Sequence, residues 1–187
     1  MLFALSAPSG AGKTTIARNI LRQFPALRFS ISATTRTRRP REVEGKDYFF
    51  LTREDFESRI AAGGLVEWEE IYGNLYGTLR SEIDRVRAEA GHMLFDIDVK
   101  GALSIKRLYG DEAVTIFIQP PSLAALRQRL EHRGTDDADV IARRMQRAAW
   151  ELDQARQFDH IVLNDDLARS IPAVADLITP HLTAPRP

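Results

Sequence analysis

A glycine-rich segment near the start of the chain contains the residue types that bind nucleotide phosphates. It reads Ala7, Pro8, Ser9, Gly10, Ala11, Gly12, Lys13 and Thr14, with Thr15 next. Glycines let backbone N–H groups turn toward a phosphate, and the N-terminus of a following helix adds positive potential. Lys13 supplies a mobile charge, and the Thr14 hydroxyl can bind Mg²⁺. The segment is therefore predicted to be a P-loop.

This segment departs from the G-x-x-x-x-G-K-[ST] pattern at one position, where Ala7 replaces the first glycine. Alanine fits there only if its φ angle is negative. The alternative is a glycine-rich turn that caps a helix and binds nothing. The predicted context, a buried strand before the loop and a helix after it, favours the P-loop.

Two carboxylates, Asp96 and Asp98, end an apolar run that begins at Met93. Carboxylates at the carboxyl end of a buried strand can hold Mg²⁺ through water or accept hydrogen bonds from a base. The alternation of a strand sends both side chains to the same face. The alternative for either residue is that it only caps the next turn.

A basic loop, residues 34–41, contains Arg36, Arg38, Arg39 and Arg41. Guanidinium groups suit phosphate oxygens, so the loop could hold a second phosphate-bearing substrate facing the P-loop. On its own, the loop could equally be a solvated run of charge.

Apolar runs alternate with helical patterns along the chain, which predicts an α/β fold with a mostly parallel sheet flanked by helices. The predicted strands are Leu2 to Ser6, Arg28 to Ala33, Met93 to Asp98, Ala113 to Gln119 and His160 to Asn164. The predicted helices are Thr14 to Phe24, Gly101 to Tyr109, Ser122 to His132, Ala138 to Gln157 and Arg169 to Leu182.

The stretch 32–85 interrupts this alternation and is predicted to be an inserted lobe at the carboxyl edge of the sheet. It holds a short strand Tyr48 to Leu51, a helix capped by Thr52 with Asp55 three residues on, and two strands around Glu67 and Tyr76.

Composition limits the classes of function. With 187 residues, 44% hydrophobic, the chain fits one domain, and 26 basic residues balance 26 acidic ones. That balance argues against nucleic acid or a membrane surface as a partner. The chain has no cysteine, its four histidines are far apart, and no run suits a secretory signal or a membrane span, so we expect a cytoplasmic protein without a transition-metal site.

The basic loop and its surroundings resemble the guanylate kinase family. The signature T-[ST]-R-x-x-[KR]-x-x-[DE]-x-x-G-x-x-Y-x-[FY] is matched by Thr34, Thr35, Arg36, Arg39, Glu42, Gly45, Tyr48 and Phe50. The resemblance continues through 66–68, 73–78, 96–101, 120–122, 133–135 and 164–166, nearly the whole chain. It implies a P-loop core (1–31, 86–125 and 150–187), a mixed α/β GMP-binding lobe (32–85) and a helical lid (126–149).

The resemblance also implies a function and the residues that perform it. ATP and GMP, and also dGMP, would be the substrates, with Mg²⁺ at Thr14 and Asp96. The GMP phosphate would contact Arg36, Arg39, Tyr48 and Tyr76, with Glu42 orienting the arginines. The guanine would meet Ser32, Glu67, Thr78 and Asp98, and Asn164 would contact the adenine or only form a turn. Lys13, Arg36, Arg39, Arg133 and Arg144 would stabilise the transferring phosphoryl group.

Three further points qualify this assignment. Arg147 lies one turn after Arg144 and could join it, but a surface salt bridge with Glu131, Asp136, Asp137 or Asp139 is favoured. Arg41 and Pro40 differ from the family's loop, which bears on the reach of Arg39. The alternatives in function are an inactive interaction module and a kinase for another phosphorylated acceptor, such as a ribose bisphosphate.

Overall fold

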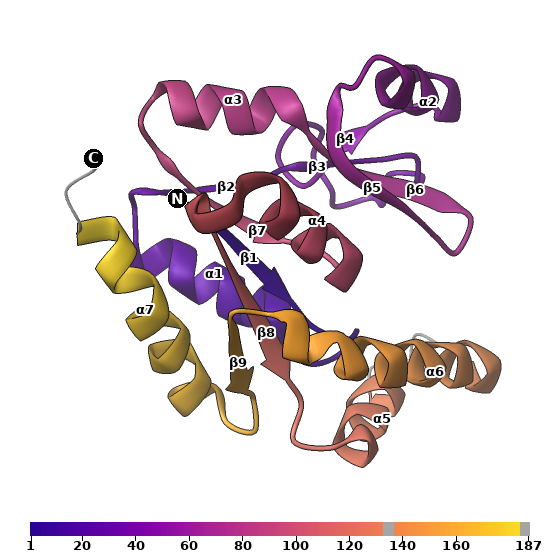
Figure 1. Ribbon diagram of the computed structural model, residues 1–187. Helices are drawn as coiled ribbons and strands as arrows, with labels where there is room; N and C mark the ends of the chain where they lie inside the picture. Colours follow the sequence, from indigo (N-terminus) through magenta and orange to yellow (C-terminus); the bar gives the residue numbers. More distant parts are fainter. Residues whose placement is uncertain (133–136, 184–187) are drawn as a thin grey trace.

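The centre of the molecule is a five-stranded parallel sheet (Figure 1). The computed structural model describes residues 1–132 and 137–183. In spatial order the strands are β2 (Leu27–Phe29), β7 (His92–Asp96), β1 (Leu2–Ser6), β8 (Ala113–Gln119) and β9 (His160–Leu163). All neighbouring pairs run parallel. The predicted parallel α/β core is thus confirmed.

Helices cover both faces of this sheet, and the alternation of β1 explains the two layers. Phe3 and Leu5 pack in one cluster with α1 (Lys13–Gln23) and α7 (Leu167–Thr183). Leu2 and Ala4 pack in another with α3 (Arg80–Ala88) and α4 (Val99–Tyr109). A strand buried on both faces is expected to be largely apolar, and all five residues of β1 are buried, with Ser6 at its end as the one polar residue.

A second sheet lies to one side of the first. Its order is β4 (Phe49–Phe50), β3 (Ser32–Thr34), β6 (Asn74–Leu79) and β5 (Leu65–Ile71), with β3 and β4 parallel and the other pairs antiparallel. Helix α2 (Arg53–Ala61) closes a small core of its own around the fully buried Phe56. The predicted cap is present, because the Asp55 N–H donates to the Thr52 hydroxyl at 3.0 Å.

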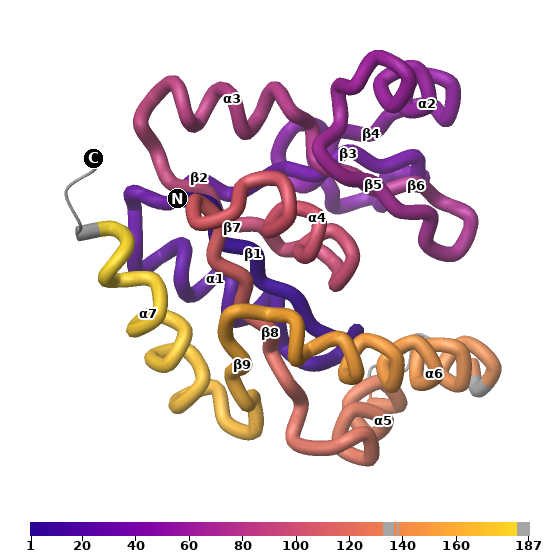
Figure 2. The backbone as a smooth tube through the Cα atoms, in the orientation of Figure 1, coloured from indigo at the N-terminus to yellow at the C-terminus, as the bar shows by residue number. Residues whose placement is uncertain are grey.

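The remaining helices extend from the carboxyl end of the central sheet. They are α5 (Leu123–His132) and α6 (Ala138–Gln154), and two short 3₁₀ turns, Gly110–Glu112 and Ala155–Gln157, follow α4 and α6. Figures 1 and 2 show the second sheet and the α5–α6 pair projecting on the same side of the central sheet. Within residues 1–132 and 137–183, no helix is long and apolar enough to cross a membrane.

One sequence prediction about the fold was wrong, and one helix was missed. The run Arg28 to Ala33 forms two strands, because the Ser30 N–H still donates to Leu94 of the central sheet while Ser32 already pairs with Thr78 of the second sheet. No glycine or proline marks this change of sheet. Helix α3 was not predicted at all; it begins directly after β6.

Candidate active site

The P-loop joins β1 to α1 and holds two glycines in a conformation that other residues avoid. Gly10 and Gly12 both have φ 94°. Among the described non-glycine residues, only Tyr72 and Ala90 have positive φ, so Ala7 meets the condition that the sequence set for it. Helix α1 begins at Lys13 directly after Gly12, which has no side chain to cap it. Its first N–H groups are therefore available to an anion.

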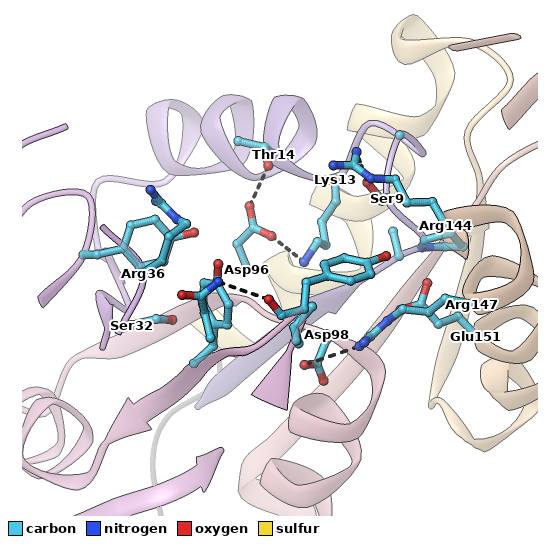
Figure 3. Close-up of a pocket in the computed structure, with 18 of the residues that line it drawn as sticks. Ser9, Lys13, Thr14, Ser32, Arg36, Asp96, Asp98, Arg144, Arg147 and Glu151 are labelled. Atoms are coloured by element: carbon cyan, nitrogen blue, oxygen red, sulfur yellow. Dashed lines mark hydrogen bonds and ion pairs between the residues drawn. The ribbon is translucent and has the colours of Figure 1, made fainter. Parts of the chain in front are cut away.

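Asp96 ties the end of β7 to the P-loop (Figure 3). Its Oδ1 lies 2.6 Å from Lys13 Nζ, and its Oδ2 accepts a hydrogen bond from the Thr14 hydroxyl at 2.9 Å. Lys13 also donates to the carbonyl of Ile97 at 2.6 Å. The hydroxyl and the carboxylate are hard oxygen donors of the kind that Mg²⁺ prefers, so the two residues fit that ion.

The basic loop is organised around one ion pair. Arg36 Nη2 lies 2.7 Å from Glu42 Oε1, and this contact raises the pKa of Arg36 and lowers the pKa of Glu42. Glu42 Oε2 accepts a hydrogen bond from the backbone N–H of Arg39 at 2.8 Å. Glu42 therefore contacts the guanidinium of Arg36 but only the backbone of Arg39. The Arg36 guanidinium lies 5.3 Å from the centre of the Tyr48 ring, which in turn packs edge-on against Tyr76.

On the second sheet, the partly buried Glu67 pairs with Thr78. The Thr78 hydroxyl, fully buried, donates to Glu67 Oε1 at 2.6 Å. Burial raises the pKa of Glu67, and the Thr78 hydrogen bond opposes that rise. Ser32 lies opposite Thr78 in the register of β3 and β6. The sequence had placed both hydroxyls against a base, but the hydroxyl of Thr78 is already bonded to Glu67.

Asp98 combines the two roles that the sequence left open. Its Oδ1 caps α4 by accepting from the Gly101 N–H at 2.8 Å. Its side chain also lines a cavity that it shares with the P-loop and the basic loop. Burial and a hydrogen bond with Glu69 raise the pKa of Asp98 to about 7. For Glu69, hydrogen bonds with Asp98, Lys100 and Arg147 outweigh burial and lower its pKa to about 2. Sequence reasoning missed Glu69, although it follows Glu67 at the two-residue spacing of one strand face.

Helix α6 brings two arginines to the site. Arg144 Nη1 lies 3.5 Å from Ser9 Oγ of the P-loop. Arg147 contacts Glu69 at 2.9 Å and Glu151 at 3.0 Å, so the favoured prediction of a surface salt bridge near the start of α6 was wrong. Glu151, only 4% exposed, was also missed. The predicted site residue Arg133 lies outside the described residues.

Asn164 is buried behind the P-loop. Its Nδ2 donates to the carbonyl of Ala11 at 2.6 Å, and its Oδ1 accepts from the Ser170 hydroxyl at 2.8 Å. It also lines a hollow beside Gly10 and Gly12. Asn164 therefore stabilises the P-loop through the Ala11 carbonyl. It also borders the hollow, where its expected contact with an adenine would be made.

A cavity of about 560 Å³ gathers these residues from three parts of the chain. The P-loop contributes Lys13 and Thr14, and α6 contributes Arg144. The second sheet and the segments around it contribute residues that include Arg36, Tyr48 and Tyr76. Such a cavity can hold two phosphate-bearing molecules face to face, with cations around the space between them. Glu67 and Asp98 border an adjoining hollow on the side of the second sheet.

Comparisons with known proteins all identify similarity to guanylate kinases. The family model described as "Guanylate kinase" matches residues 2–181. A guanylate kinase of Salinibacter ruber is 52% identical over 179 residues, covering 95% of this chain and 93% of that protein. One from Chlorobaculum tepidum is 47% identical over 186 residues, covering 98% and 94%. The crystal structure of guanylate kinase from Anaplasma phagocytophilum superposes with a TM-score of 0.80 at 28% identity, covering 98% of this chain and 87% of that one.

Proposed function

The chain belongs to the guanylate kinase family, and on that premise we propose that it transfers the γ-phosphoryl group of ATP to GMP, giving ADP and GDP. One observation carries the proposal: Lys13 of the P-loop and Arg36 of the basic loop line the same cavity as Asp98. A donor triphosphate, an acceptor phosphate and a base therefore have binding groups in one space.

The proposal extends to the domain organisation. We assign the second sheet and α2 to the GMP-binding lobe (32–85) and the α5–α6 pair to the lid (126–149). The core would bind ATP through the P-loop, with the adenine in the hollow bordered by Asn164. Arg36, Arg39, Tyr48 and Tyr76 would receive the GMP phosphate.

Guanine suits the carboxylates on this side of the cavity. Its N1–H and 2-amino group are donors that Glu67 and Asp98 can accept, and Ser32 can donate to O6. Adenine presents an acceptor at N1 and has no 2-amino group, so it would leave a buried carboxylate unpaired. GMP and dGMP share the base and the 5'-phosphate, so both are expected acceptors.

The chemistry needs positioning more than proton transfer. The acceptor phosphate is already anionic, so no general base is required, and the residues act by alignment and charge stabilisation. Mg²⁺, held through Thr14 and Asp96, would supply further positive charge to the phosphates. Lys13, Arg36, Arg39, Arg133 and Arg144 would surround the transferring group, and closure of the lid over the lobe would exclude water. We place this activity in the cytoplasm, which suits a chain without cysteine.

The test is ADP release with MgATP and each of GMP, dGMP, AMP, CMP, UMP and ribose 1,5-bisphosphate. Turnover confined to GMP and dGMP is expected. The variant Glu67→Gln should raise the KM for GMP far more than the KM for ATP. If the folded protein binds ATP but releases no ADP with any acceptor, an inactive interaction module would be favoured. Turnover with ribose 1,5-bisphosphate alone would favour a kinase for that sugar bisphosphate.

A further inference from the structure

Glu69 on β5 joins three elements of the fold. Its Oε1 lies 2.7 Å from Lys100 Nζ of α4, and its Oε2 lies 2.9 Å from Arg147 Nη2 of α6. The Glu69 side chain is only 10% exposed. A carboxylate this sheltered is retained as an anion only when cations compensate its lost hydration. Its low pKa, described above, is consistent with that compensation.

Arg147 uses separate nitrogens for two carboxylates. Nη2 faces Glu69, while Nε donates to Glu151 at 3.0 Å. Asp98 Oδ2 lies further away, at 3.9 Å from Nη2 (Figure 3). Although burial opposes it, Glu151 and Glu69 raise the pKa of Arg147, so it stays charged at every physiological pH. A lysine has a single nitrogen and cannot make both contacts in these directions.

The same helix touches the P-loop one turn earlier. Arg144 Nη1 lies 3.5 Å from Ser9 Oγ, whereas Arg147 reaches the second sheet. Figure 3 shows the two side chains entering the cavity from the same helix, with Glu151 beside Arg147. A movement of α6 away from β5 would therefore carry Arg144 with it, because both arginines lie on the same helix.

We propose that Arg147 is a positioning residue for phosphoryl transfer: by bridging Glu69 and Glu151 it holds α6 against the second sheet and thereby places Arg144 over the reacting phosphates. The inference rests on the proposed function. Glu69, the partner of Arg147 on β5, helps to hold α6 in place from the side of the sheet. Neither residue needs to touch a substrate to act in this way.

The kinetic test compares Arg147→Gln with Arg143→Gln, an exposed arginine one turn earlier on α6. Breaking a largely sheltered ion pair should lower kcat for GMP phosphorylation roughly tenfold to a hundredfold, with the KM for ATP little changed. Arg147→Lys should fail to restore kcat, and Arg143→Gln should leave it unchanged. A kcat of Arg147→Gln equal to that of Arg143→Gln would overturn the proposal.

A double-mutant cycle tests whether Arg147 acts through Glu69. Glu69→Gln should reproduce the loss, and adding Arg147→Gln to it should cost little more, because the bridge is already broken. Additive losses would mean that the two residues act separately. Far-UV circular dichroism and thermal unfolding would identify any variant that simply fails to fold.

A distance measurement tests the bridge without relying on activity. Because the chain has no cysteine, the pair Ala62→Cys and Ala149→Cys, at exposed positions after α2 and on α6, can be spin-labelled specifically. Adding Arg147→Gln should lengthen or broaden the label-to-label distance distribution, whereas adding Arg143→Gln should not. An unchanged distribution would refute the bridge. If the wild type failed to phosphorylate GMP, the proposed function would fall, and this measurement would still decide whether Arg147 holds the helix to the sheet.

Discussion

Replacing Thr78 by valine tests how the base is recognised. The exchange keeps the shape of the side chain and removes only the hydroxyl that donates to Glu67 at 2.6 Å. Hydrogen bonds to charged groups contribute about 1.5–3 kcal/mol, which corresponds to roughly a 10- to 150-fold change in binding. Because the bond is already present without GMP, only its effect on how well Glu67 accepts from guanine reaches the binding equilibrium. We therefore expect Thr78→Val to raise the KM for GMP by at most that factor and to leave the KM for ATP unchanged.

The loss in GMP affinity caused by Thr78→Val should depend on pH. Burial already raises the pKa of Glu67, and the Thr78 hydrogen bond holds it down. Without that bond the pKa rises further, so at a given pH a larger share of Glu67 is protonated and accepts more weakly from guanine. The loss in GMP affinity should therefore shrink as the pH is raised. Initial rates with varied GMP between about pH 6 and 9 would measure it.

Two comparisons separate indirect from direct action of Thr78. If Thr78 acts only through Glu67, the double variant Thr78→Val/Glu67→Gln should bind GMP no worse than Glu67→Gln. Additive losses would show instead that the Thr78 hydroxyl contacts the base itself. Thr179→Val on α7, whose hydroxyl donates to a helix carbonyl, makes the same chemical change away from the cavity and should leave both KM values unchanged. An unaltered KM for GMP in Thr78→Val would refute the reasoning.

Three further outcomes are expected. Lys13→Ala should lower kcat by several orders of magnitude with the circular dichroism spectrum unchanged, and near-normal turnover would contradict its role in the P-loop. Gly12→Ala should destabilise the protein by about 2 kcal/mol or more in urea unfolding, because φ is 94° and the new Cβ would clash with Asn164 Nδ2; a wild-type midpoint would show that the loop tolerates the change. The affinity for GMP should rise as the pH increases through about 7, because the ionised Asp98 carboxylate accepts hydrogen bonds more strongly than the protonated acid. Below that pH, GMP binding should release protons to a weakly buffered solution, and a pH-independent affinity would argue against this role of Asp98.

The sequence by itself determined the features that lie within short stretches of chain. The P-loop, the signature around Arg36 and the apolar runs of β1 and β8 depend on neighbouring residues, so spacing and periodicity are enough to recognise them. The same locality made the condition on Ala7 and the cap at Thr52 predictable. The change of sheet between β2 and β3 was missed, because those residues favour an extended backbone throughout and only their pairing partners differ.

Only the tertiary structure decided which side chains meet across the cavity. Arg147 contacts Glu69 across 78 positions, and Asn164 contacts Ala11 across 153. No local pattern encodes such pairs, because burial and the available partners are properties of the packed elements. The partner of Thr78 was likewise not predictable, because a threonine hydroxyl can donate to a base or to a carboxylate equally well. Its position opposite Glu67 on β5 places the hydroxyl 2.6 Å from the carboxylate, to which it donates.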